Sequence, residues 1–176
     1  MRDGGGKQKG SQFERLICWK LSRFIDPQGE DTLFWRSAMS GGRSTRQAKK
    51  GIKNQSQAGD ITCIHPDGNW LTQYFVIECK FYADLNLSSS ILFGKGKLAG
   101  FWRDLNLVAG KANKYPLLIA KQNRIEPLVI MDDNGLRTFK TFGNNVDIIL
   151  TTRGMVKLRR AGYAQSIAKF HKIFGP

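Results

Sequence analysis

Features of membrane and secreted proteins are missing from this sequence of 176 residues. No apolar run approaches the roughly 20 residues that a transmembrane helix needs. The N-terminal stretch MRDGGGKQKGSQ lacks the apolar core of a signal peptide. We therefore expect a cytoplasmic protein that makes no membrane contact.

Cysteine and histidine are also scarce. Cys18, Cys63 and Cys79 lie in apolar patterns, and an odd number of cysteines without a secretion signal argues for reduced thiols rather than a disulfide framework. There is no Cys-x-x-Cys motif, and His65 and His171 are far apart in the chain. This pattern argues against a zinc site.

Acidic residues are few relative to basic ones. The chain has 28 Lys and Arg residues against 14 Asp and Glu residues, which gives a net charge of +14. Such an excess favours a polyanionic partner, most often nucleic acid. A ribosomal-type protein or a merely soluble basic protein remains the alternative at this point.

The apolar pattern predicts a single α/β domain. Residues 1–10 are expected to form a flexible basic arm and residues 11–176 the domain. Helical spacing begins at Ser11 and recurs over 98–112, and a basic helix is expected over 161–174. Strands are expected at 32–36, 60–64, 70–82, 115–121, 126–131 and 146–150, with a DDNG turn following the fifth. Loops are expected over 37–59 and 83–97, and alternation of helices and strands indicates a mixed sheet flanked by helices.

Two carboxylates stand out because they lie in apolar surroundings. Asp60 opens one expected strand, and Glu78 lies within the next, on the same strand face as Tyr74, Val76 and Lys80. If HPDGN at 65–69 closes a hairpin, Asp60 lies beside Glu78. Adjacent carboxylates repel unless a cation lies between them. A hard cation such as Mg²⁺ or Mn²⁺ suits this oxygen-rich site, with the carbonyl of Cys79 as a third ligand.

Lys80 completes a possible catalytic set, because its ammonium can hold a phosphate oxygen or position the attacking water. Carboxylates, a lysine and a metal ion in a basic protein indicate a nuclease. Glu14 is a further candidate if it faces the sheet. Alternatively, Ser11 and Glu14 form a capping box. For Asp60, Glu78 and Lys80, the alternative is a cross-strand salt bridge on a solvated face.

Basic residues gather in the two expected loops. A long loop inside a compact domain is usually functional, so we expect the loop over 37–59 to be mobile and to contact DNA. The aromatic residues are expected to be in the core rather than to stack on bases: Trp35, Trp70, Phe101 and Trp102. The expected DNA contacts are Arg36, Arg43, Arg46, Lys49, Lys50, Lys53, Lys95 and Lys97.

The ordered set of Glu14, Asp60, Glu78 and Lys80 resembles the PD-(D/E)xK nuclease superfamily. KGSQFERLICWKL followed by FWRSAMSGG is similar to its archaeal-type and phage Holliday junction resolvases, where a Gly-Ser-x-x-Glu-Arg helix start precedes a strand with arginine and a loop with serine. The similarity covers roughly the first half of the chain well. The chain departs from the motif at Gly59, where the superfamily name has proline.

The resemblance implies a restriction-endonuclease-like fold and a homodimeric, metal-dependent DNA endonuclease that resolves four-way junctions, from a phage or prokaryote. Asp60 and Glu78 would bind metal, Lys80 would stabilise the transition state, and Glu14 would act through metal or water. Ser37 or Ser40 would match the loop serine. The alternatives are another endonuclease of the superfamily, restriction-like, nicking or repair, on duplex or flap DNA, and a nucleic-acid-binding protein without catalysis.

Overall fold

The computed structural model describes residues 5–29, 32–37, 58–142 and 150–151. A four-stranded mixed sheet forms its centre, in the order β3-β4-β5-β6. The long strands β3 (Phe75–Tyr82) and β4 (Tyr115–Gln122) are parallel. β5 (Leu128–Met131) is antiparallel to β4, and β6 (Leu150–Thr151) is parallel to β5. β1 (Phe34–Arg36) and β2 (Ile61–Cys63) form a separate antiparallel pair.

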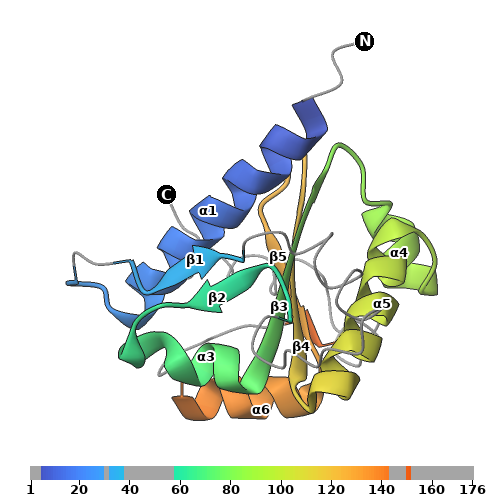
Figure 1. The fold of residues 1–176 in the computed structure, drawn as a ribbon. Helices are drawn as coiled ribbons and strands as arrows, with labels where there is room; N and C mark the ends of the chain where they lie inside the picture. Colours follow the sequence, from blue (N-terminus) through green and yellow to red (C-terminus); the bar gives the residue numbers. More distant parts are fainter. Residues whose placement is uncertain (1–4, 30–31, 38–57, 143–149, 152–176) are drawn as a thin grey trace, which may run out of the picture.

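Each face of the sheet is covered by its own hydrophobic cluster. Phe75, Ile77 and Cys79 pack with α1 (Gly5–Ile25) and the β1–β2 pair. Val76, from the alternate position of β3, packs with α5 (Lys97–Ala112). Figure 1 shows α1 on one side of β3 and β4, and α4 (Leu87–Phe93) and α5 on the other. This is the restriction-endonuclease-like arrangement of a mixed sheet flanked by helices that the sequence predicts.

The helix α1 begins earlier than predicted. It includes residues 5–10, so these six residues are helical rather than a flexible arm. Lys9 lies over the ring of Phe81, with 4.1 Å between Nζ and the ring centroid, and its Nζ donates a hydrogen bond to Oδ1 of Asn123. At the other end, the Oγ of Ser22 accepts from the N–H of Leu33, which ties the helix to the chain entering β1.

Several expected loops and turns are helical. The HPDGN segment forms the 3₁₀ helix η2 (Pro66–Gly68), and residues 70–74 belong to α3 (Asn69–Tyr74) rather than to a strand. Tyr74 therefore does not share a strand face with Glu78. The expected loop over 83–97 contains α4 and the first residue of α5. The expected DDNG turn at 132–135 instead leads into α6 (Asp133–Phe142). Oδ1 of Asp132 accepts a hydrogen bond from the N–H of Gly135 there.

No helix among the described residues is long and apolar enough to cross a membrane. The expected strand over 146–150 is described only at its last residue, in β6. The expected helix over 161–174 and most of the basic loop lie outside the described residues.

Candidate active site

Asp60 reaches β3 without the predicted hairpin, since β2 and β3 belong to different sheets. Its backbone N–H donates to the carbonyl of Ile77 at 2.7 Å, and its carbonyl accepts from the N–H of Ser37 at 2.7 Å. Its Oδ2 accepts from the N–H of Cys79 at 2.8 Å. Only 5% of Asp60 is exposed, so these bonds fix a buried carboxylate at the Glu78–Lys80 segment.

Gly59 makes this approach possible. Its φ is +99°, and a Cβ at this position would lie 2.5 Å from the carbonyl oxygen of Ile77. Proline is locked near −65° and cannot adopt this angle. The departure from the Pro-Asp motif therefore has a local cause, because only glycine fits the backbone here without strain.

Glu78 and Lys80 lie two residues apart on β3 and form an ion pair through Oε1 and Nζ. Their side chains are only 25% and 23% exposed, respectively. Nζ of Lys80 is 5.5 Å from the ring centroid of Phe101, on α5. The pair is therefore partly buried on the α5 side of the sheet rather than on a fully solvated face.

The electrostatics of Glu78 favour a cation. Burial and, after it, the negative charge of Asp60 raise the pKa of Glu78 above its ordinary value, while Lys80 opposes the shift and Glu14 adds to it. Burial lowers the pKa of Lys80, but the charge of Glu78 and its hydrogen bond outweigh burial and raise it. Lys80 is thus protonated at neutral pH, and the acidic side chains Asp60, Glu78 and Glu14 outnumber the basic side chains Lys80 and Arg36.

Among the described residues, no group of three or more His, Cys, Asp and Glu side chains is placed to hold a metal ion. A divalent ion would instead use Asp60, Glu78 and backbone or water oxygens. The carbonyl of Cys79 fits this role, since a strand residue directs its N–H and C=O to the same edge, and that N–H already bonds Asp60. Mg²⁺ commonly binds through one or two carboxylates and keeps several waters.

Glu14 faces the sheet, as one of the two sequence interpretations expects. Its Oε2 pairs with Nε of Arg36 at 2.7 Å, and its side chain is 14% exposed. The capping-box interpretation is wrong, because α1 begins six residues before Ser11. The charge of Glu14 reaches Glu78, whereas its direct partner is Arg36 on β1.

Some of the serine and basic residues predicted from the sequence lie within the described residues, and others do not. Ser37 is buried, and its Oγ lies 2.7 Å from Oγ1 of Thr62, so it is part of the β1–β2 region rather than of a mobile loop. Lys95 and Lys97 are exposed near the start of α5. The remaining candidates lie outside the described residues: Ser40, Arg43, Arg46, Lys49, Lys50 and Lys53.

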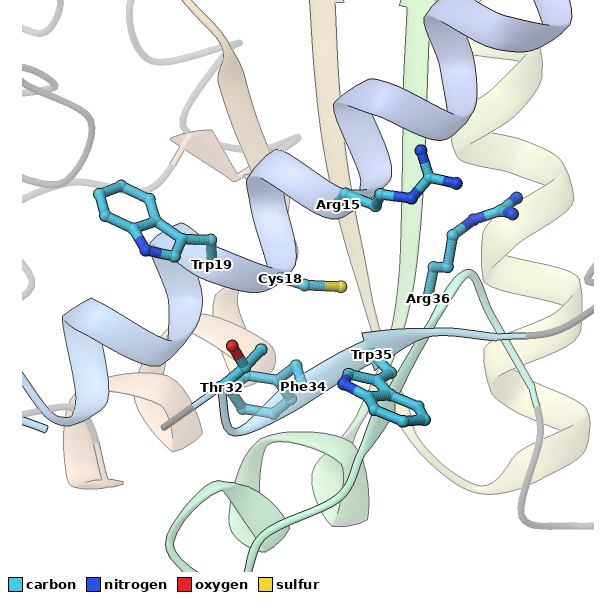
Figure 2. A pocket seen from close by; sticks show the side chains of 7 residues that line it. All are labelled: Arg15, Cys18, Trp19, Thr32, Phe34, Trp35 and Arg36. Carbon is cyan, nitrogen blue, oxygen red and sulfur yellow. The ribbon is translucent and has the colours of Figure 1, made fainter. Parts of the chain in front are cut away.

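The aromatic predictions hold for three of four residues. Trp70, Phe101 and Trp102 pack against the two core clusters, but Trp35 is 63% exposed. With Arg15, Trp19 and Arg36, it lines a pocket between α1 and β1, shown in Figure 2. The sequence pattern does not single out Arg15 and Trp19 as site residues. Both residues lie outside the apolar stripe of α1, and this position indicates that their side chains are not part of the core.

No curated protein and no solved structure matches the chain. Nucleases of the PD-(D/E)xK type generally use divalent metal ions. Residues 5–173 match the model of a family described as phage putative PDDEXK endonuclease, and the chain therefore belongs to that family.

Proposed function

We propose that this protein is a Mg²⁺-dependent DNA endonuclease, with Asp60 and Glu78 as metal ligands and Lys80 as the group that contacts the scissile phosphate. The hydrogen bond from Cys79 to Asp60 carries this proposal, because it holds one carboxylate against the segment that bears the other two groups. Family membership supports nuclease activity over the alternative of binding without catalysis.

Each residue has a distinct task in this proposal. A bound divalent ion supplies an activated water and stabilises charge that develops on the phosphate. Lys80 is protonated, because its pKa is raised, and it can donate to a non-bridging phosphate oxygen. Glu78 holds Lys80 in position through their ion pair. Glu14 acts on Glu78 through its charge and holds Arg36.

At the level of substrate, we propose that four-way DNA junctions are preferred. The support is the resemblance of the α1 and β1 segments to resolvases. Resolution requires two sites that reach opposed strands, and a two-fold symmetric homodimer is the simplest way to provide them. The strands from Tyr115 to Met131 are mostly buried within one subunit, so they are poor dimer surfaces, whereas Leu107 and Val108 of α5 are exposed and apolar.

The test is cleavage of labelled four-way, flap, duplex and single-stranded DNA of shared sequence with Mg²⁺ or Mn²⁺. We expect Mg²⁺-dependent cleavage, with paired symmetric cuts in the junction and tighter binding of the junction than of the duplex at equal salt. Equal rates on junction and duplex, or a monomer in solution, would remove the resolvase assignment and leave a more general nuclease. Absence of cleavage on all four substrates would remove the nuclease assignment.

A further inference from the structure

The pocket between α1 and β1 combines aromatic, apolar and basic side chains. It has a volume of about 390 Å³, within the usual range for small-molecule sites. Arg15, Cys18 and Trp19 line it from α1, and Phe34, Trp35 and Arg36 line it from β1. Figure 2 shows Trp19 on α1 and Trp35 on β1 at opposite ends of the pocket, with Cys18, Thr32 and Phe34 between them, while the two arginine side chains extend in the same general direction.

The two tryptophans are exposed in spite of their size. Trp19 is 51% exposed and Trp35 is 63% exposed. Neither ring is needed to fill a core cluster of the described residues. Exposed aromatic rings beside a basic surface are a common platform for unpaired bases, because every base has a face that stacks.

The floor of the pocket is apolar and neutral. Cys18 and Phe34 are almost completely buried. Burial, with a smaller contribution from Glu14, raises the pKa of the Cys18 thiol to about 12, so the thiol carries no charge at neutral pH. An uncharged floor suits a planar base rather than a phosphate, which would lie at the basic rim.

The rim supplies positive charge. Arg15 is exposed and makes no ion pair with another described residue. Arg36 is shared with Glu14, whose charge also acts on Glu78. The pocket is therefore linked to the candidate active site only through Glu14, which pairs with Arg36 and whose charge acts on Glu78.

We propose that this pocket holds unpaired nucleotides of the nucleic-acid substrate, with bases stacked on Trp19 and Trp35 and phosphates at Arg15 and Arg36. The proposal rests on the proposed nuclease function and adds to it a preference for DNA with an unpaired nucleotide near the cleaved bond. A gap or flap offers such a nucleotide, and a four-way junction offers one where a base pair opens at the branch point, whereas a continuous duplex does not.

The experiment measures tryptophan fluorescence on adding a short oligothymidylate, a duplex of equal length, or thymidine monophosphate, with EDTA present so that no cleavage occurs. The tryptophan fluorescence of the wild-type protein should be quenched at a lower concentration of the single strand than of the duplex. The mononucleotide should quench it only weakly. Quenching by the single strand should be smaller in Trp19→Phe and in Trp35→Phe than in the wild type. It should be unchanged in Trp70→Phe. Trp19→Ala and Trp35→Ala should weaken binding roughly tenfold or more, because stacking contributes strongly per base.

Equal quenching by duplex and single strand, or full quenching after both tryptophans are replaced by phenylalanine, would overturn the proposal. Light scattering tests separately whether the pocket is a contact between subunits. If Trp19→Ala or Trp35→Ala lowers the molar mass, the pocket is a subunit contact and the proposal is wrong. Since binding is measured without cleavage, quenching in a protein that cuts no substrate would contradict the nuclease assignment alone. Cleavage without quenching would contradict only the pocket assignment.

Discussion

The backbone N–H of Cys79 donates a 2.8 Å hydrogen bond to Oδ2 of Asp60, which holds that carboxylate between the side-chain positions of Glu78 and Lys80. The donor is a backbone group, so the contact does not depend on the Cys79 thiol, which is buried on the other face of β3. An asparagine at position 60 retains an oxygen that can accept this bond. Charge at this position can therefore be removed without removing the contact.

Asp60→Asn is accordingly expected to fold but to bind divalent metal at least about tenfold more weakly, since even partners of metal ligands contribute roughly 10–100-fold to affinity. Calorimetric titration with Mn²⁺ measures this change. Asp104→Asn is the matched control, because Asp104 is an exposed carboxylate on α5. Equal Mn²⁺ affinity in both variants would show that Asp60 is not a ligand.

The raised pKa of Glu78 predicts how metal binding depends on pH. Metal ligands must be deprotonated, so Mg²⁺ should lose its stabilising effect on the melting temperature as the pH falls through the pKa of Glu78, which is raised above its ordinary value. In the metal-free protein, the contribution of Glu78 to folding stability changes with pH in the opposite direction. A glutamate with a raised folded pKa contributes stability that is fully present at low pH and is lost as the pH rises through that value.

The carboxyl ¹³C chemical shift of Glu78, followed by NMR without metal, tests the cause of this shift. Asp60→Asn should move its titration to lower pH, because the charge of Asp60 is the second-largest contribution after burial. An unchanged titration in this variant would mean that the two carboxylates do not interact.

Lys80→Ala should reduce the single-turnover cleavage rate by roughly 10²–10³-fold, as is typical when one preorganised charge is lost from an active site. DNA affinity in EDTA should change little, because many basic residues contact the phosphate backbone. Lys111→Ala, in the last turn of α5, is the control. If the circular dichroism of Lys80→Ala shows an unfolded protein, Lys80 has a structural role and the catalytic assignment loses its support.

Gly59→Ala should destabilise the protein by at least about 1–3 kcal/mol, the usual cost of a strained backbone residue, because its Cβ would lie 2.5 Å from the carbonyl oxygen of Ile77. Denaturant unfolding measures the change. Gly100→Ala is the control. Gly100 lies in α5 with no neighbouring atom within 4 Å of an added Cβ, so this change should stabilise by about 0.5–1 kcal/mol. Similar effects of the two substitutions would contradict the observed approach of Gly59 to β3.

Periodicity in the sequence predicts the long elements well, because α1, α5, β3 and β4 have apolar residues at the spacing that packing requires. Periodicity does not predict the helix α3, because Trp70, Leu71 and Tyr74 also suit a strand and β propensity depends strongly on context. The preceding 3₁₀ turn, which begins at Pro66, leads directly into this helix.

The sequence predicts the proximity of Asp60 and Glu78 for a partly wrong reason. The sequence indicates a hairpin, but the structure connects Asp60 to β3 through individual hydrogen bonds. The exposure of Trp35 and the pairing of Glu14 with Arg36 depend on how the short strand β1 lies against α1. Such contacts between distant segments leave little pattern in a sequence.

The most direct test of the central claim is single-turnover cleavage of a labelled four-way junction by the wild type, Glu78→Gln and Glu126→Gln at saturating Mg²⁺. Glu126 is exposed between β4 and β5 and serves as the matched control. We predict that the wild type and Glu126→Gln cut at similar rates and that Glu78→Gln, though folded and bound to the junction, does not cut. Cleavage by Glu78→Gln at the wild-type rate would contradict the assignment of Asp60, Glu78 and Lys80 as the catalytic centre.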